Sequence, residues 1–397
     1  MTVTFSPSKP SGSVAAPPSK SMAHRLLICA GQAIGAQTVH GVAPSEDILA
    51  TVDCLRALGV TCDLRGGDAI LTGYTLHCGE KGAVLPCRES GSTLRFFLPL
   101  CLFGPPMTLT GSARLLARPL DVYADLCKKQ GIRFEKGANA VTVQGRLSPG
   151  EFRLPGDVSS QFVSGLLFKL PRLSGDSVIR LRPPVESRGY IDMTMAALRA
   201  YGVETHWLDR ETIAVPGRQC FQFRSDVTVE GDWSNAAPFL ALGVPVTGLN
   251  PDSLQGDRVC AAYFDALRHG PAALDISDCP DLGPLLFAFA AMHHGGTFTG
   301  TRRLRMKESD RAWAMYEELQ KFGVELRVEE NAVTVGHGVH APAQDLDGHG
   351  DHRVVMALSV LCTQTGGTIR GAETVGKSFP DFFERLGALG IRVRTTT

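Results

Sequence analysis

A repeated pattern of apolar and polar positions runs along the whole chain. It consists of a helix with one apolar face, then a glycine, then Val or Ile, then a strand in which apolar and polar residues alternate. The glycine closes the helix, because it adopts the positive φ of a helix end without steric cost. The pattern recurs at Gly59, Gly131, Gly202, Gly323 and Gly390, and a degenerate copy surrounds Gly270. The chain is therefore predicted to contain six related units of about 70 residues, the fourth of them shortened.

Each unit is also predicted to open with a second helix, whose first turn is polar and whose remainder is apolar. These helices lie in SKSMAHRLLICAG, ESGSTLRFFLPL, DVSSQFVSGLLF, DWSNAAPFLAL, DCPDLGPLLFAFAAM and GDHRVVMALSVL. A short strand follows each helix, so the unit is βαβαββ-like and the fold class is α/β. Six such units fit two domains of three units, since three units together reach an ordinary domain size.

The chain is predicted to cross between these two domains twice. The turn-rich stretch 218–231 provides one crossing. The other lies at the Pro17–Pro18 pair, behind an N-terminal strand that can complete a sheet of the C-terminal domain. We therefore expect one domain over residues 17–226 and a discontinuous domain over residues 1–16 and 227–397, joined by a two-strand hinge.

Composition excludes several classes of protein. The 397 residues carry 40 Lys plus Arg and 40 Asp plus Glu, so no overall positive field attracts nucleic acid or an anionic membrane. The first residues lack the apolar stretch of a secretory signal, and we expect a cytoplasmic protein. The 11 cysteines, Cys78 among them, form no CxxC pair, so we expect ordinary thiols and no metal.

Basic side chains collect in two places of the units, the first turn of the polar-headed helix and the loop after the next strand. If the units are related, these places are equivalent, and the free N–H groups of helix N-termini suit anions. The residues are Lys20, Arg25, Arg95, Arg118, Arg188, Arg303, Arg305, Lys307, Arg311, His352, Arg353 and Lys377. Because so many cations repel one another, a polyanion must neutralise them, and Arg suits phosphate and carboxylate. A phosphorylated small acid is the predicted ligand.

Hydroxyl, amide and carboxylate groups stand among these cations. Ser21, Ser159, Ser160, Gln161 and Ser187 would orient the ligand through hydrogen bonds. Asp281 and Glu308 are the candidates for general base and general acid, because neighbouring cations keep a carboxylate ionised. Asp47 and Asp310 are more typical of helix caps or ion-pair partners.

Among the histidines, His352 suits the site best, because it lies between Asp351 and Arg353 at a predicted helix start. Five other histidines lack the spacing of metal or substrate ligands, and we expect them at the surface. They are His293, His294, His337, His340 and His349.

Ten segments of the chain resemble, in order and spacing, the signatures of one enzyme family. They are PSKSMAHR, ESGSTLRF, ARPLDVY, GDVSSQFVSGLL, VESRGYIDMT, VEGDWSNAAPFL, DCPDLGP, RLRMKESDR, GDHRVVMAL and KSFPDFFE. The family is that of 5-enolpyruvylshikimate-3-phosphate (EPSP) synthase, or 3-phosphoshikimate 1-carboxyvinyltransferase. The resemblance implies the inverse α/β prism fold and transfer of the enolpyruvyl group of phosphoenolpyruvate to the 5-hydroxyl of shikimate 3-phosphate. It implies no metal or organic cofactor, a place in the shikimate pathway and, we expect, a monomer.

The resemblance also implies roles for individual residues. The implied catalytic residues are Lys20, Asp281, Glu308 and His352. The implied shikimate 3-phosphate ligands are Lys20, Ser21, Arg25, Ser159, Ser160, Ser187, Tyr190, Asp281 and Lys307. The implied phosphoenolpyruvate ligands are Lys20, Gly91, Arg118, Gln161, Arg311, Arg353 and Lys377. The domain of residues 17–226 would then hold shikimate 3-phosphate, and the other would close the cleft with phosphoenolpyruvate-side residues.

The implied reaction is addition followed by elimination through a tetrahedral intermediate. Glu308, helped by His352, would protonate the vinyl carbon, while Asp281 or Lys20 would take the proton of the attacking hydroxyl. The two substrates together bring roughly −5 to −6 charges, which would offset the cluster of bases. Domain closure would exclude water from the reacting pair.

Two departures and two alternatives accompany this resemblance. Many members have Asn-Ala-Gly-Thr where this chain has residues 89–92, Glu-Ser-Gly-Ser, and some place an asparagine at the position of Arg303. One alternative is the sibling enolpyruvyl transferase acting on UDP-N-acetylglucosamine. It usually carries a reactive cysteine ahead of the loop arginine, where this chain has Ala113. The other is a non-catalytic binding or scaffold relative, which the intact Lys20 and Asp281 disfavour.

Overall fold

The computed structural model describes residues 1–73 and 82–396, and it divides into two compact units. We call Pro18–Glu230 the first unit, and Met1–Pro17 together with Gly231–Thr397 the second unit. The chain changes unit at residues 17/18 and 230/231, one and four residues later than expected. The later second change follows from a strand, Asp226–Thr228, which pairs with a strand of the first unit. Cys78 lies outside the described residues.

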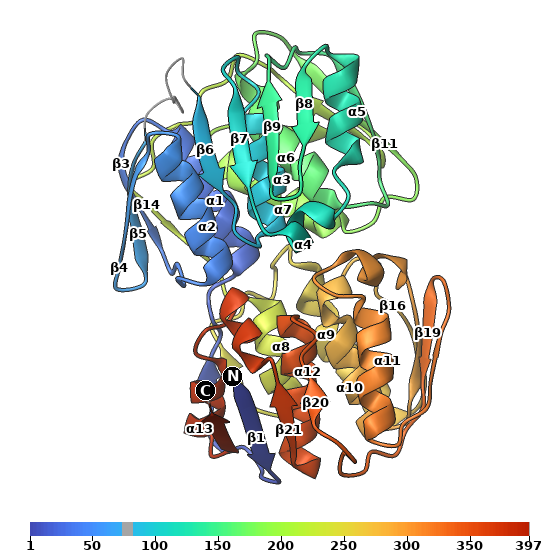
Figure 1. The fold of residues 1–397 in the computed structure, drawn as a ribbon. Helices are drawn as coiled ribbons and strands as arrows, with labels where there is room; N and C mark the ends of the chain where they lie inside the picture. The colour runs from blue at the N-terminus through green and yellow to red at the C-terminus, as the bar shows by residue number, and fades with distance from the viewer. Residues whose placement is uncertain (74–81, 397) are drawn as a thin grey trace. The chain divides into compact units, whose positions relative to one another are not determined.

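Three similar modules make up the first unit (Figure 1). Its strands are β3 (Gly35–His40), β4 (Thr61–Arg65), β5 (Asp68–Gly73), β6 (Ala83–Pro86), β7 (Met107–Thr110), β8 (Arg133–Lys136), β9 (Ala140–Gln144), β10 (Glu151–Pro155), β11 (Ser177–Arg182), β12 (His206–Trp207), β13 (Thr212–Val215) and β14 (Asp226–Thr228). Its helices are α1 (Lys20–Gln32), α2 (Glu46–Ala57), α3 (Gly91–Leu100), α4 (Ala113–Ala117), α5 (Asp121–Lys129), α6 (Ser160–Lys169), η1 (Leu170–Arg172) and α7 (Arg188–Ala200).

The second unit repeats this plan with one reduced module. Its strands are β1 (Thr2–Ser6), β2 (Val14–Ala15), β15 (Val246–Thr247), β16 (Ala272–Asp275), β17 (Gly296–Thr299), β18 (Leu326–Val328), β19 (Ala332–Val335), β20 (Leu346–Asp347), β21 (Gly367–Arg370) and β22 (Arg392–Thr396). Its helices are α8 (Trp233–Ala241), η2 (Gly256–Val259), α9 (Cys260–His269), η3 (Pro280–Leu282), α10 (Gly283–Met292), η4 (Arg302–Met306), α11 (Arg311–Lys321), α12 (His352–Thr365), η5 (Ala372–Lys377) and α13 (Phe382–Ala388).

The described strands form five four-stranded sheets of one pattern. The orders are β14-β3-β5-β4, β6-β7-β9-β8, β10-β11-β13-β12, β16-β17-β19-β18 and β20-β21-β1-β22. In each sheet the first pair of strands is parallel and the next two pairs are antiparallel. This common pattern agrees with βαβαββ-like repeats and with a mixed α/β fold.

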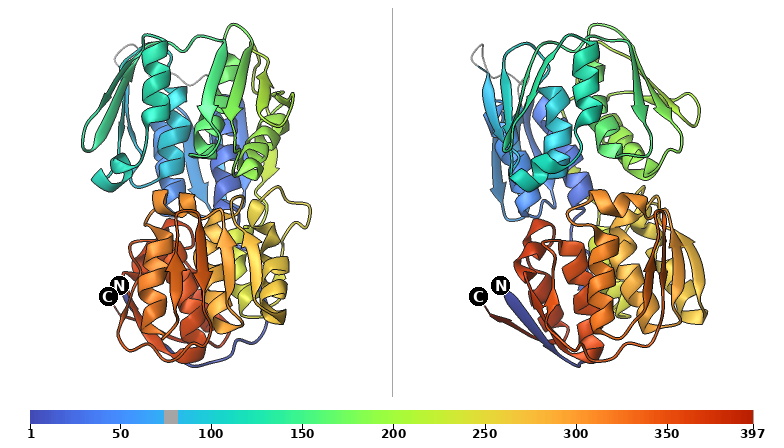
Figure 2. Two further views of the ribbon diagram at one scale, coloured as in Figure 1. Left: turned by 90° about the vertical axis from the view of Figure 1, so that its right-hand side faces the viewer. Right: turned by 45° about the vertical axis from the view of Figure 1, so that its right-hand side comes forward.

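Strands from distant parts of the chain complete three of the sheets. β1 pairs with β21 and β22, as its position ahead of the Pro17–Pro18 pair predicts. The two chain ends consequently lie side by side (Figure 2). β14 completes the first sheet, and β2 pairs with β15 in a two-stranded sheet that is all that remains of the fourth module. The prediction for the degenerate copy needs correction, since Ala272–Asp275 pairs with β17 and is therefore the first strand of the next module's sheet, β16-β17-β19-β18.

The polar-headed helices begin where the sequence predicts. Side chains of Ser19, Ser90, Ser159, Asp232 and Asp351 cap α1, α3, α6, α8 and α12 by accepting from backbone N–H groups of the first turn. The rest of these helices is buried, and in Figure 1 α10 and α12 lie between strands of the fifth and sixth modules. Each unit has its own hydrophobic core. No helix of the described residues is long and apolar enough to span a bilayer.

Candidate active site

The first turn of α1 carries two of the predicted cations. Lys20 forms an ion pair with Asp47, at 2.8 Å between Nζ and Oδ2. Asp47 is thus an ion-pair partner, as expected. Arg25 is buried and donates to Thr194 Oγ1 and to the carbonyl oxygens of Ser21 and Tyr190. Burial lowers the pKa of Arg25 to about 10, so it remains a cation at neutral pH.

The first turns of α3 and α6 bring together a second group of predicted residues. A Cβ atom added to Gly91 would lie 2.7 Å from Nη1 of Arg118 and 3.1 Å from Nη1 of Arg95. Arg95 donates to Gln161 Oε1 at 2.8 Å, and Gln161 Nε2 donates to Ser92 Oγ at 3.0 Å. The absence of a side chain at residue 91 thus lets two guanidinium groups approach the α3 N-terminus.

The loop that departs from the family pattern has clear hydrogen-bonding roles. Ser90 caps α3 and also accepts from Thr93 Oγ1 at 2.8 Å, while Ser92 holds Gln161. Ser90 and Ser92 therefore supply the hydrogen bonds of this loop, which the sequence alone did not predict.

The predicted phosphate ligands of the third module lie at the starts of α6 and α7. Ser159 caps α6, and Ser160 is 6% exposed. Ser187 precedes α7 in the left-handed conformation, with φ of 54°. Thr194 joins these helices to α1, because it lies 2.7 Å from Ser164 and accepts from Arg25.

In the second unit, one buried guanidinium joins three carboxylates. Arg311 is 1% exposed, and its nitrogens lie 2.7 Å from Asp281, 2.8 Å from Glu308 and 2.9 Å from Asp351. Oδ1 of Asp281 also lies 3.1 Å from Nζ of Lys307, and Oδ2 of Asp281 lies 3.6 Å from Nη2 of Arg353. The predicted base and the predicted acid are therefore held by the same arginine.

The electrostatics of this cluster follow from that geometry. Burial alone would raise the pKa of Asp281, but the charges of Lys307, Arg311 and Arg353 outweigh burial and hold that pKa well below its usual range. Burial lowers the pKa of Lys307, with Asp281 acting in the opposite direction. Burial also opposes the charge of Arg311, yet its carboxylate neighbours raise its pKa well above the ordinary value. Asp281 is thus an ionised acceptor among cations.

The start of α12 carries further predicted residues of the second unit. Asp351 is fully buried, caps α12 through the N–H of Arg353 at 2.9 Å and also holds Arg311. Arg353 donates to Asn235 Oδ1 at 2.8 Å. Lys377 donates to the carbonyl oxygen of Gly350 at 3.2 Å.

The remaining predicted residues of the second unit lie in varied surroundings. His352 is 2% exposed, with Nδ1 4.0 Å from Oδ1 of Asp351. Asp310 caps α11, as expected. Arg305 is exposed and donates to the Glu329 carbonyl oxygen. Arg303 is buried.

Sequence reasoning missed Asn235 and the full role of Asp351. Asn235 lies in the polar head of α8, accepts from Arg353 and donates to the Ser378 carbonyl oxygen at 3.2 Å. The only available signal was its place in the polar head WSN, equivalent to the other helix starts.

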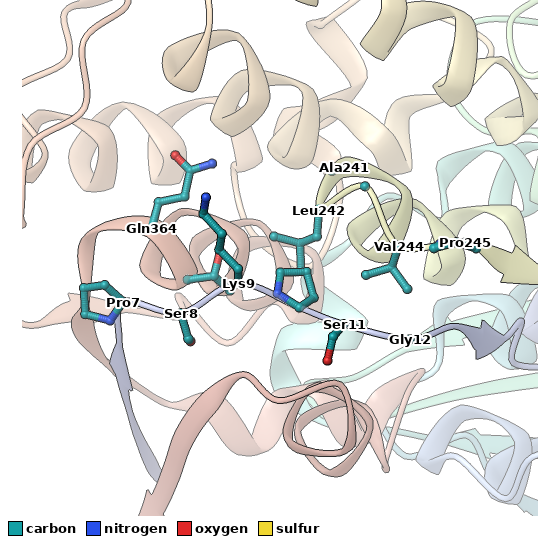
Figure 3. A pocket seen from close by; sticks show the side chains of 13 residues that line it. Pro7, Ser8, Lys9, Ser11, Gly12, Ala241, Leu242, Val244, Pro245 and Gln364 are labelled. Carbon is teal, nitrogen blue, oxygen red and sulfur yellow. The ribbon is translucent and has the colours of Figure 1, made fainter.

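A cavity of about 710 Å³ lies elsewhere in the second unit (Figure 3). Pro7–Gly12, Ala241–Pro245, Thr363 and Gln364 line it. Thr363 and Gln364 belong to the last turn of α12, about 20 Å along the helix from the residues at its start. None of the predicted site residues lines this cavity.

Comparisons with known proteins cover nearly the whole chain. The profile of EPSP synthase (3-phosphoshikimate 1-carboxyvinyltransferase) matches residues 6–386. A 3-phosphoshikimate 1-carboxyvinyltransferase of Clostridium kluyveri is 38% identical, over 98% of this chain and 97% of its own. One of Clostridium novyi is 36% identical, over 96% and 97%.

Solved structures agree with the fold. An EPSP synthase of Acinetobacter baumannii is 24% identical, with a TM-score of 0.77 over 100% of both chains. The enolpyruvyl transferase NikO of Streptomyces tendae is 16% identical, with a TM-score of 0.78 over 100% of this chain and 98% of its own.

Proposed function

Since the chain belongs to the EPSP synthase family and catalyses enolpyruvyl transfer from phosphoenolpyruvate to shikimate 3-phosphate, we propose specific roles for the residues described above. This reaction is a step of the shikimate pathway to the aromatic amino acids. The single observation that carries the proposed roles is the Asp281 cluster. It holds one ionised carboxylate against Lys307, Arg311 and Arg353.

Shikimate 3-phosphate is proposed to bind mainly through the first unit. Its proposed ligands there are Lys20, Ser21, Arg25, Ser159, Ser160, Ser187 and Tyr190. Ser159 and Ser187 stand at helix starts, where backbone N–H groups and the helix dipole favour a phosphate. Asp281 and Lys307 of the second unit are proposed to contact the same substrate at its reacting hydroxyl.

Phosphoenolpyruvate is proposed to bind through residues of both units. The proposed ligands are Lys20, Gly91, Arg118, Gln161, Arg311, Arg353 and Lys377. The close approach of Arg118 and Arg95 to Gly91 supports this assignment, because fork-shaped guanidinium groups bind phosphate and carboxylate in two places at once.

The proposed chemistry assigns proton transfer at the vinyl carbon to Glu308 and proton transfer from the 5-hydroxyl to Asp281 or Lys20. Glu308 donates a proton to the vinyl carbon, which makes the neighbouring carbon electrophilic, and the 5-hydroxyl attacks that carbon as Asp281 or Lys20 accepts its proton. The tetrahedral intermediate then expels phosphate, and the Glu308 carboxylate takes back a proton from the former vinyl carbon, which restores the double bond. Glu308 is partly exposed, whereas His352 is almost fully buried, so His352 is proposed to support Glu308 indirectly.

Charge balance favours a pair of acidic substrates. Four cations, Lys307, Arg311, Arg353 and Lys377, stand with three carboxylates in the second unit's cluster. In the first unit, Lys20 pairs with Asp47, while Arg25 donates to Thr194 and Arg95 donates to Gln161. Two phosphates and two carboxylates carry roughly −5 to −6 charges and would neutralise the excess of cations.

Three finer features are also part of this proposal. We propose that the five similar sheets and the reduced module form the inverse α/β prism, and that the enzyme is a monomer. A cytoplasmic location is supported by the ten described cysteines, all free thiols and nine of them buried, since a reducing compartment preserves such thiols.

Phosphate release with defined substrates tests the reaction. We expect phosphate only when both phosphoenolpyruvate and shikimate 3-phosphate are present. Replacing shikimate 3-phosphate by UDP-N-acetylglucosamine should give none. Release with the nucleotide sugar alone would favour the sibling transferase, and no release with either acceptor would favour a non-catalytic relative.

A further inference from the structure

His349 lies in a turn just ahead of α12, where a buried carboxylate of α11 holds it. Its Nε2 lies 2.9 Å from Oε1 of Glu318, whose side chain is 1% exposed. The His349 side chain itself is 22% exposed, so the histidine expected at the surface is only partly exposed. The pair joins the turn to the helix that carries Arg311 at its start.

Glu318 gathers several parts of the second unit. Both of its oxygens lie 2.9 Å from Nζ of Lys321, and its Oε2 accepts from the N–H of Asp347 at 3.0 Å. A buried carboxylate with this many donors holds its neighbours in place, because losing any donor leaves its negative charge less well compensated. His349 is the donor that comes from the turn itself.

The backbone of this turn needs such support. The N–H of Asp351 donates to the Gly348 carbonyl oxygen at 2.9 Å, which closes a four-residue turn with His349 second. His349 has φ of 50°, a conformation that residues other than glycine seldom adopt. Contacts of the side chain must therefore stabilise a backbone conformation that is unfavourable by itself.

A turn of the same kind, with a positive-φ residue held through its side chain, occurs at the equivalent place of the first unit. Ahead of α3, the N–H of Ser90 donates to the Cys87 carbonyl oxygen at 2.9 Å, and Arg88, second in that turn, has φ of 52°. Arg88 is held by two carboxylates of α2, Glu46 and Asp53, each at 2.6 Å. Both turns precede a helix start that carries proposed phosphoenolpyruvate ligands, Gly91 in one case and Arg353 in the other.

The far side of the His349 turn contacts the proposed ligands. The Gly350 carbonyl oxygen accepts from Lys377 at 3.2 Å. Asp351 accepts from Arg311 and from the N–H of Arg353, each at 2.9 Å. A shift of the turn would therefore displace the side chains of Lys377 and Arg311 together.

We propose that His349, anchored by Glu318, is a positioning residue for phosphoenolpyruvate: it fixes the turn through which Lys377, Arg311 and Arg353 are held in place. This inference rests on the phosphoenolpyruvate assignments made under the proposed function. It does not make His349 a catalytic residue, since the side chain acts through the turn.

The pair of His349 and Glu318, which we call the anchor, should respond to pH. The charged groups that face His349 are Glu317 and Glu318 of α11, with Lys321 beside them, and Asp347 at the end of β20. The hydrogen bond that His349 donates to Glu318 raises the pKa of His349, and burial opposes this effect less strongly. A raised histidine pKa means that the charged pair is complete at lower pH and is lost as pH rises through that pKa. The KM for phosphoenolpyruvate should increase over the same range.

Steady-state kinetics of His349→Asn test the proposal. Asparagine tolerates positive φ but has a shorter side chain and does not titrate. We expect the KM for phosphoenolpyruvate to rise about threefold to tenfold, the size of one lost hydrogen bond. The kcat and the KM for shikimate 3-phosphate should stay within about twofold, because Lys307 and Arg353 also hold Asp281. The ratio of variant to wild-type KM should shrink as pH rises.

Matched variants separate the possible failures. His340→Asn, at an exposed histidine of the same unit, should match the wild type. Lys377→Met should raise the KM for phosphoenolpyruvate by itself, and if it does not, the ligand assignment fails rather than the anchor. If Lys377→Met acts and His349→Asn does not, the anchor is refuted.

Two further outcomes are equally decisive. If both KM values of His349→Asn rise together with a loss of kcat, the role is merely structural and the proposal fails. Should His349→Asn not fold, Glu318→Gln keeps the shape of the anchor and removes its charge. That variant should show the same selective rise in the KM for phosphoenolpyruvate, to a smaller extent, and an unchanged KM would overturn the proposal.

Discussion

Asp281 is the residue on which the proposed chemistry depends most directly. It is ionised and contacts two cations, Lys307 and Arg311, so its carboxylate is free of a proton before the 5-hydroxyl attacks. Asp281→Ala should leave binding of shikimate 3-phosphate measurable by calorimetry and lower kcat by about 10²-fold or more. Asp275→Asn, at an exposed carboxylate on β16, should keep wild-type kcat. Full turnover by Asp281→Ala would refute the assigned role.

Arg311 should matter for stability as well as for binding. Its guanidinium compensates Asp281, Glu308 and Asp351, the last of which is fully buried. Arg311→Met would leave these carboxylates facing one another, and removing one partner of a buried ion pair costs about 3–5 kcal/mol. We expect urea unfolding to show a loss of that size for the second unit. Arg305→Met, at an exposed arginine of the same unit, should change it little, and equal stabilities would contradict the compensation argument.

At the residue scale, the sequence predicted the members of the site better than their partners. Asp281, Lys307 and Arg311 were all identified from local motifs, and both cations contact Asp281. Asn235 was missed, because its partner Arg353 is 118 positions away and nothing local marks the pair. The contact of His349 with Glu318 was not predicted, because it depends on how α11 packs against the turn, which periodicity does not reveal.

At the scale of elements, the start of α3 offers a steric test. An added Cβ at Gly91 would lie 2.7 Å from Arg118 Nη1, so the guanidinium must move. Gly91→Ala should therefore raise the KM for phosphoenolpyruvate about threefold to tenfold, with a smaller effect on the KM for shikimate 3-phosphate. Gly270→Ala, where a Cβ meets nothing within 4 Å, is the matched control. Equal KM values in both variants would remove Arg118 from the phosphoenolpyruvate site.

Elements with a strong local signal were predictable, and those completed from afar were not. Five predicted helix-closing glycines have positive φ, whereas Gly270, with φ of 167°, is extended. The fourth module differs for a reason that no local pattern contains, because its two-stranded sheet is completed by β2 from the N-terminal segment. The same kind of long-range pairing moves the second crossing, since β14 joins the sheet of β3.

At the scale of the whole molecule, two separate cores predict two separable unfolding events. The chain holds three tryptophans, Trp207 in the first unit and Trp233 and Trp313 in the second. A chain with Trp233→Phe and Trp313→Phe reports on the first unit. One with Trp207→Phe and Trp313→Phe reports on the second. Because each unit has its own core, we expect the two urea midpoints to differ.

Shikimate 3-phosphate should separate these midpoints in a defined direction. Most of its proposed ligands belong to the first unit, so saturation at 100 times Kd should stabilise the unit reported by Trp207 by up to about 2.7 kcal/mol. The Trp233 midpoint should move less, because that unit contributes only Asp281 and Lys307. A larger shift at Trp233 would reverse the proposed division of the substrate between the units. If the two midpoints coincide both with and without ligand, the two cores unfold as one. Independent units would differ in midpoint with ligand present, because the ligand stabilises one of them more than the other.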